Sequence, residues 1–167
     1  VLSRPPFGAV EDQRASPYLE RINGYGYYQL RPVGSLRLTA GLSYDRLTYP
    51  QNVDLPPVRS GESDRGLWGL KIGATWEPWQ NGWLRAAWTR SLGGLFFDNS
   101  VRLEPAQVAG FTSAFRSLIP ESTEGLVPGT KFDSSTLGFD QKWPHGTYFG
   151  LGGEWLTSSG SRDAGAV

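Results

Sequence analysis

The side chains best suited to nucleophilic and acid–base chemistry are scarce in this sequence. It has one histidine, His145, and no cysteine. The lack of cysteine excludes disulfides, thiolate zinc sites, iron–sulfur clusters and cysteine nucleophiles, and a single histidine excludes a multi-histidine metal site. A Ser–His–acid triad would need His145 to be held beside a nucleophile. Because it lies between Pro144 and Gly146 in a predicted tight turn, we interpret it as a solvated turn residue.

Acidic side chains offer two further candidate sites. Asp140 and Glu154 could serve a hydrolase as paired carboxylates, but lumen salt bridges with Lys142 and Arg85 explain them equally well. Three loop carboxylates could bind calcium together with backbone carbonyls, namely Asp54, Glu62 and Asp64. Their spacing does not match a recognised calcium loop. We therefore interpret both groups as structural or solvated charge. The sequence predicts no enzyme, no metal site and no cofactor.

The overall charge and the glycine motifs argue against nucleic-acid and phosphate binding. The 167 residues carry 16 basic and 16 acidic side chains, without a basic stripe of interleaved aromatics. Glycine is abundant, with 22 residues, but GYGYY and GLGGE lie inside predicted strands rather than in the strand–loop–helix context of a phosphate loop. Methionine is absent, the initiator included. We therefore expect an internal piece of a longer protein.

Two segments alternate apolar and polar side chains with the period of a β-strand. In residues 35–47 and 67–77, most even-numbered positions are apolar and most odd-numbered positions are polar or glycine. A period of two gives a strand one apolar and one polar face. Four segments show a less regular form of this pattern, with Arg90 as an exception on the apolar face: residues 21–31, 83–92, 134–143 and 147–157. We predict an all-β fold, an antiparallel meander of about six strands.

The predicted connections alternate between short and long. Pro32–Gly34, Pro78–Gly82 and Pro144–Gly146 are tight turns rich in proline and glycine, whereas residues 48–66 and 93–133 are long links. Compact soluble domains rarely carry a structureless loop longer than about 15 residues. Outer-membrane barrels combine short periplasmic turns with long extracellular loops. The rhythm of the connections therefore favours a fragment of a transmembrane β-barrel.

The second long link has a helical pattern of its own. Its apolar residues recur at spacings of three and four, Pro105 suits a first helical turn, and Pro120 ends the run. We predict one short amphipathic helix that packs inside its own loop, with capping or plugging of the barrel mouth as the alternative. The apolar positions are Val108, Phe111, Phe115 and Leu118.

The two predicted faces differ in the way expected of a barrel wall. Trp68 and Trp76 bracket an apolar stretch that rises about 19 Å in a tilted strand, close to the apolar band of an outer-membrane barrel. The predicted lipid-facing aromatic girdles are Tyr44, Trp68, Trp76, Trp143 and Trp155. The predicted lumen-facing charges balance in sign: Arg37, Asp45, Lys71, Glu77, Arg85, Asp140, Lys142 and Glu154.

The same segments resemble a known class of outer-membrane proteins. LRLTAGLSYDRLTYP resembles strands of TonB-dependent receptors, and WEPWQNGWLRAAWTRSLGG resembles their barrel hairpins. RLEPAQVAGFTSAFRSLIPES is similar to a loop of outer-membrane barrels attached to tetratricopeptide repeats in Gram-negative bacteria. The likeness covers residues 20–160. It implies a barrel in the cell outer membrane, with a plug or a tetratricopeptide-repeat domain as a partner.

These observations give one main interpretation and two alternatives. We expect residues 1–19 to be an irregular segment from a preceding loop, 20–160 a partial outer-membrane β-barrel, and 161–167 a truncated tail. Its expected task is to line a polar passage for uptake of a small-molecule or oligomeric substrate, in contact with outer-membrane lipid and the rest of the barrel. The alternatives are an export pore fused to repeat domains and a soluble antiparallel β-barrel that binds an apolar ligand around Leu38, Ile72 and Phe139.

Overall fold

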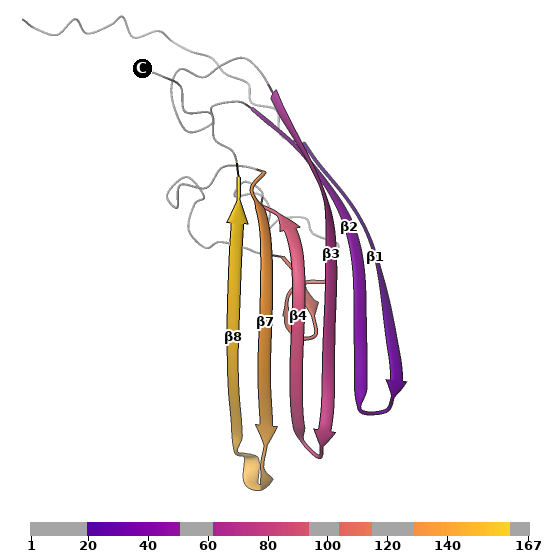
Figure 1. The fold of residues 1–167 in the computed structure, drawn as a ribbon, viewed down its shortest axis with the longest axis vertical. Helices are drawn as coiled ribbons and strands as arrows, with labels where there is room; N and C mark the ends of the chain where they lie inside the picture. The colour runs from indigo at the N-terminus through magenta and orange to yellow at the C-terminus, as the bar shows by residue number, and fades with distance from the viewer. Residues whose placement is uncertain (1–19, 51–61, 94–103, 115–128, 161–167) are drawn as a thin grey trace, which may run out of the picture.

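A computed structural model describes residues 20–50, 62–93, 104–114 and 129–160 (Figure 1). Their main feature is a six-stranded antiparallel sheet in the order β1-β2-β3-β4-β7-β8. The strands are β1 (Glu20–Val33), β2 (Leu36–Pro50), β3 (Glu62–Trp79), β4 (Gly82–Leu92), β7 (Lys131–Lys142) and β8 (Tyr148–Ser159). The predicted meander of six antiparallel strands is confirmed. The expected terminal segments, 1–19 and 161–167, lie outside the described residues.

The tight turns lie where the sequence places them. Residues 34–35 join β1 to β2, and residues 80–81 join β3 to β4. A short 3-10 turn, η2 (Pro144–Gly146), joins β7 to β8. Asn81 has a φ of 61° and His145 a φ of 70°, the left-handed conformation that sharp reversals require. Each of these turns closes one antiparallel hairpin of the sheet.

β2 and β3 are longer than the alternation alone predicts. Their pairing continues without a register shift from Leu36↔Trp76 to Pro50↔Glu62. Residues 48–50 and 62–66, which the sequence assigns to a long link, therefore belong to the sheet. The polar residues of this stretch hid it, because they break the apolar period while their backbone groups still pair across the two strands.

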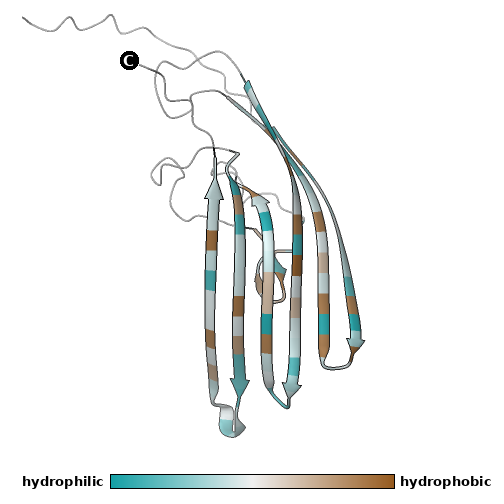
Figure 2. Ribbon diagram, in the orientation of Figure 1, coloured by the Kyte–Doolittle hydropathy of each residue, from teal (hydrophilic) through white to brown (hydrophobic). Residues whose placement is uncertain are grey.

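The register gathers the alternating side chains onto two opposite faces. One row crosses the whole sheet through Tyr28, Ala40, Ile72, Trp88, Ser135 and Trp155. We call the side that carries this row the apolar face. The next row crosses the other side through Tyr27, Gly41, Lys71, Thr89, Ser134 and Leu156. We call that side the polar face. Figure 2 shows the resulting alternation of hydrophobic and hydrophilic residues along the strands.

Burial is inverted relative to a water-soluble sheet. On the apolar face, large side chains are exposed, among them Leu70 and Ile72, each 46% accessible. On the polar face, Ser43, Asp45 and Lys71 are each at most 1% accessible. Water-soluble proteins bury apolar faces because removing them from water is favourable. The packed interior of the described residues therefore lies on the side with polar side chains.

The predicted helix in the second long link is wrong. Residues 107–112 instead form a small hairpin of β5 (Gln107–Val108) and β6 (Phe111–Thr112). Ala109 and Gly110 both have positive φ, 52° and 88°, as in the two-residue turns that suit hairpins. Val108 and Phe111 pair directly across this turn, so a spacing of three that looked helical comes from a hairpin. Phe115 and Leu118 lie outside the described residues.

The location of the hairpin also differs from the location predicted for the helix. It packs on the polar face, where the side chain of Val108 meets Gly73 of β3, rather than inside its own loop. Figure 1 shows it at the level of the middle of β3 and β4. In the described part of the chain, no helix is long and apolar enough to cross a membrane.

Candidate functional site

The predicted girdle residues lie on the apolar face or at its turn end. Tyr44 and Trp68 are direct cross-strand neighbours, and their rings lie 4.9 Å apart. Trp143 lies just past the end of β7, with its ring 6.3 Å from that of Phe149 in β8. Trp155 is 60% accessible on the edge strand. The structure thus brings Tyr44 together with Trp68, while the other girdle residues are distributed across the sheet.

Four of these tryptophans form two lines across the sheet. Trp68 and Trp155 lie toward the loop ends of the strands, and Trp76 and Trp143 lie toward the turn ends. In β3, Trp68 and Trp76 are eight residues apart. On β7, Ser135 faces Trp155 of β8, and Trp143 lies eight residues after Ser135. The row of Trp155 passes through Ile72, four residues from Trp68 toward the turn. Relative to the rows of Trp68 and Trp76, Trp155 and Trp143 each lie four residues nearer the turn end, Trp155 three strands away from β3 and Trp143 two strands away.

Sequence reasoning missed one aromatic residue at the turn end. Trp79, at the end of β3, is 51% accessible, and its indole Nε1 donates to Gln141 Oε1 at 2.6 Å. Its ring lies 6.1 Å from that of Phe139. The motif WEPW could have drawn attention to it. Its position after Pro78 had placed it in a turn instead.

Beyond Tyr44 and Trp68, the apolar-face positions of β2 and β3 become ionic. Arg46 forms an exposed salt bridge with Asp64 at 2.9 Å, and the Thr48 hydroxyl donates to Asp64 Oδ1 at 2.6 Å. The hydrogen bond from Thr48, followed by that from Arg46, lowers the pKa of Asp64 below its ordinary value. The Asp64 carboxylate is thus bound by Arg46 and Thr48. Asp54, the other loop aspartate of the predicted calcium site, lies outside the described residues. Within the described ranges, no three acidic or histidine side chains gather as a metal site would require.

Arg90, the exception on the apolar face, has a partner on the next strand. Asp133 of β7 lies directly opposite, and Arg90 Nε donates to its carboxylate at 2.7 Å. The guanidinium also lies 5.2 Å from the centre of the Trp88 ring. The pair is two residues from the loop end of β4 at Leu92. Arg90 with Asp133 and Arg46 with Asp64 are thus both apolar-face salt bridges near the loop ends of their strands. We call these two salt bridges the ionic margin.

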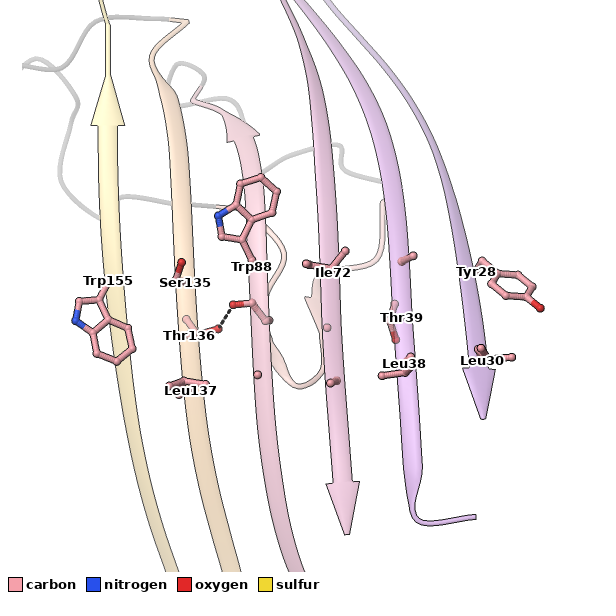
Figure 3. A pocket seen from close by; sticks show the side chains of 15 residues that line it. Tyr28, Leu30, Leu38, Thr39, Ile72, Trp88, Ser135, Thr136, Leu137 and Trp155 are labelled. Carbon is pink, nitrogen blue, oxygen red and sulfur yellow. Dashed lines mark hydrogen bonds between the residues drawn. The ribbon is translucent and has the colours of Figure 1, made fainter. Parts of the chain in front are cut away.

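A shallow apolar cavity of about 680 Å³ lies across the middle of the apolar face. Small side chains form its floor, including Ala40, Ala74 and Ala86, and Trp88 and Trp155 stand beside them. Figure 3 shows these tryptophans together with Leu38, Ile72 and Leu137 along the neighbouring strands. The cavity is a surface feature of the sheet, and its lining includes no carboxylate, imidazole or amine side chain.

Two predicted charges of the polar face form buried clusters. Asp45, 1% accessible, accepts hydrogen bonds from Arg21 Nη2 and Asn23 Nδ2, both at 2.8 Å. Lys71 forms an ion pair with Glu104, with both side chains fully buried. The Tyr27 hydroxyl donates to the same carboxylate at 2.6 Å. These charges therefore hold chain segments together rather than facing open water.

The remaining predicted charges differ in their surroundings. Arg85 forms a salt bridge with Asp140 and lies 5.3 Å from the centre of the Phe111 ring. Glu154 accepts a hydrogen bond from Ser134 at 2.8 Å. The other three lie toward the turn end: Arg37 is exposed, the Glu77 carboxylate accepts from the Asn81 backbone at 3.3 Å, and Lys142 lies 5.5 Å from the Tyr148 ring centre.

The candidate catalytic pair is not assembled. Asp140 faces Gly150 across the strands, and Glu154 faces Thr136. Four residues of strand separate these rows, which is about 13 Å, too far for a hydrolase pair that acts on one bond. The expected salt bridge of Asp140 with Arg85 is present, whereas the one expected for Glu154 is replaced by its hydrogen bond with Ser134. His145 is exposed in η2.

Comparison with known proteins gives no relative. No family model, no curated protein sequence and no solved structure matches this chain.

Proposed function

We propose that this chain forms part of the wall of an outer-membrane β-barrel, with the apolar face toward lipid and the polar face toward a polar passage. The inverted burial supports this arrangement. A face that carries exposed Leu70, Ile72 and Trp68 is stable in hydrocarbon but costly in water. The barrel belongs to the type that the resemblance indicates, related to TonB-dependent receptors, and takes up a polar substrate across the outer membrane.

The observation that carries the proposal is the joint shift of the two aromatic lines. Strands in such barrels tilt by about 45° and lie about 4.8 Å apart, so a planar boundary moves along each next strand by about 1.4 residues. This predicts about four residues over the three steps from β3 to β8, and about three residues over the two steps from β3 to β7. The observed shift is four residues at both lines. Two boundaries that shift in the same direction by about these amounts are what a slab of lipid imposes on the surface of a tilted sheet.

The ionic margin supports the same boundary. Arg46 with Asp64, and Arg90 with Asp133, occupy apolar-face positions only toward the loop ends of their strands. An arginine near the membrane interface costs about 0–1 kcal/mol, against about 2–4 kcal/mol at the midplane. Between the two aromatic lines, acyl chains would fill the shallow cavity beside Trp88 and Trp155.

The two alternatives make different demands on the faces. A soluble ligand-binding barrel needs the apolar face inside, but the described residues pack on the opposite, polar face. An export pore fused to repeat domains shares the wall architecture with the uptake barrel. It differs only in the direction of transport.

Site-directed spin labelling of the full-length protein in membranes tests the proposal. Arg37 and Leu38 are adjacent in β2 and lie on opposite faces, so cysteines at these positions form a matched pair at one depth. We expect a nitroxide at position 38, and one at position 70, to collide mainly with dissolved oxygen. A label at position 37 should collide mainly with a water-soluble nickel complex. Labels at positions 38 and 70 that are packed among protein side chains and reached by neither probe would overturn the membrane assignment.

A further inference from the structure

The hairpin β5–β6 fits the polar face through glycines of the sheet. A Cβ atom on Gly73 would collide with Val108, and one on Gly138 would lie 2.9 Å from the ring of Phe111. Both glycines lie on polar-face rows, in β3 and β7. They lack a side chain where the two apolar residues of the hairpin arrive. The sheet therefore has a complementary seat for this hairpin.

Polar contacts hold both ends of the seat. Glu104 precedes the hairpin and is joined to Lys71 of β3 and to Tyr27 of β1. On the other side, Arg85 of β4 stacks on Phe111. Val108 is 1% accessible and Glu104 4%. Contacts to four strands of the sheet fix the position of the segment, so it is part of the wall rather than a loop that lies on it by chance.

We propose that residues 104–114 form a fixed constriction that limits the size of solutes in the passage. This inference rests on the proposed function, because the polar face must line a passage. A layer of strand packs about 10 Å from the sheet it covers, so the hairpin removes about that much of the width over its own area. Its exposed residues carry no charge: Gln107, Gly110 and Thr112. The hairpin therefore adds no charge of its own at this point, and we expect it to limit solutes by size.

A disulfide tests whether the hairpin is seated. A Cβ on Gly73 would lie 3.0 Å from the Cβ of Ala109, close enough for a cross-link with a small adjustment. The chain has no cysteine of its own. The same Cβ on Gly73 would also meet a methyl group of Val108, so the cysteines are placed in a Val108→Ala background that removes it. In the full-length protein in membranes, we expect Gly73→Cys with Ala109→Cys in this background to form the disulfide under mild oxidation. We expect Gly152→Cys with Ala109→Cys to form none. Failure of the first pair in a folded barrel would overturn the seating.

Liposome swelling tests the constriction itself. Full-length protein is reconstituted, and entry of neutral sugars of increasing size is compared between the wild type and a variant with residues 104–114 replaced by a Gly–Ser linker. We expect swelling with the largest sugars to rise at least several-fold in the variant. Gly73→Leu, which blocks the seat, should act in the same direction. The control Ser158→Leu, at an exposed polar-face position of β8 six residues from the Gly138 row, should leave the size limit unchanged.

The outcomes separate this inference from the proposed function. Permeation with an unchanged size limit in the linker variant would overturn the constriction and leave the passage intact. A barrel that is inserted in the membrane by spin labelling but admits no sugar in any variant would overturn the passage, and the constriction with it. Cross-linked protein that keeps the wild-type limit, beside a linker variant with a larger one, supports both.

Discussion

Lys71 and Glu104, 33 residues apart in sequence, form an ion pair in which neither side chain is accessible to solvent. Lys71 lies in the middle of β3, and Glu104 begins the segment that crosses the polar face. The pair therefore ties this segment to the sheet. It also means that Lys71, predicted as a lumen-facing charge, lies on the expected face but is covered by the chain itself.

Removing one partner of this pair should be strongly destabilising. Lys71→Met leaves the Glu104 carboxylate buried without its cation, which typically costs about 3–5 kcal/mol. The free energy of unfolding from lipid vesicles, measured by urea titration, checks this. Lys71→Met with Glu104→Leu removes both charges and should cost much less than the sum of the single changes. Additive losses would show that the two side chains do not interact.

Charge on the two faces should have unequal effects. Ile72→Arg places a cation on the apolar face midway between the aromatic lines, and we expect a loss of about 2–4 kcal/mol of folding free energy in bilayers. Thr136→Arg, one row away on the polar face, should cost far less because the new cation lies directly opposite the Glu154 carboxylate. Both are measured by the same urea titration. Equal costs at the two positions would contradict the assignment of the faces.

Asp64 should titrate below the ordinary range for aspartate. Its folded-state pKa is lowered, first by the hydrogen bond from Thr48 and then by Arg46. The contact therefore stabilises the fold above the unfolded pKa of about 3.9, and this stabilisation is lost as the pH falls through the lower, folded pKa. Carboxyl chemical shifts across a pH series measure this titration. Thr48→Val should raise the pKa toward the ordinary value, and an unchanged pKa would show that Thr48 is not the cause.

The isolated chain should not remain monomeric in buffer without detergent. The apolar face exposes many large side chains, and β1 and β8 leave unpaired strand edges within the described sheet. Exposed apolar patches and open edges favour association. Light scattering after gel filtration should report oligomers or aggregates, and addition of detergent should reduce their size. A monodisperse monomer in plain buffer would favour the soluble-barrel alternative.

The sequence by itself determined the strands, their faces and their tight turns. Alternation at positions such as Leu70, Lys71 and Ile72 is a local property, because successive side chains of a strand point to opposite sides. Turn positions such as 144–146 are also local, since proline and glycine restrict or free the backbone there. These signals were enough to place Trp68, Trp76 and Trp155 on one face.

Only the tertiary structure decided that residues 107–112 of the second long link form a hairpin rather than a helix. Val108 and Phe111 are three residues apart both on one side of a helix and across a two-residue hairpin turn, so their spacing does not separate the two structures. The choice depends on Gly73 and Gly138, distant glycines that make room for a hairpin on the polar face. The partner of Lys71 was hidden for the same reason, because Glu104 reaches it only when the chain folds back across the sheet. Contacts between distant segments leave no periodic trace in the sequence, whereas strand alternation does.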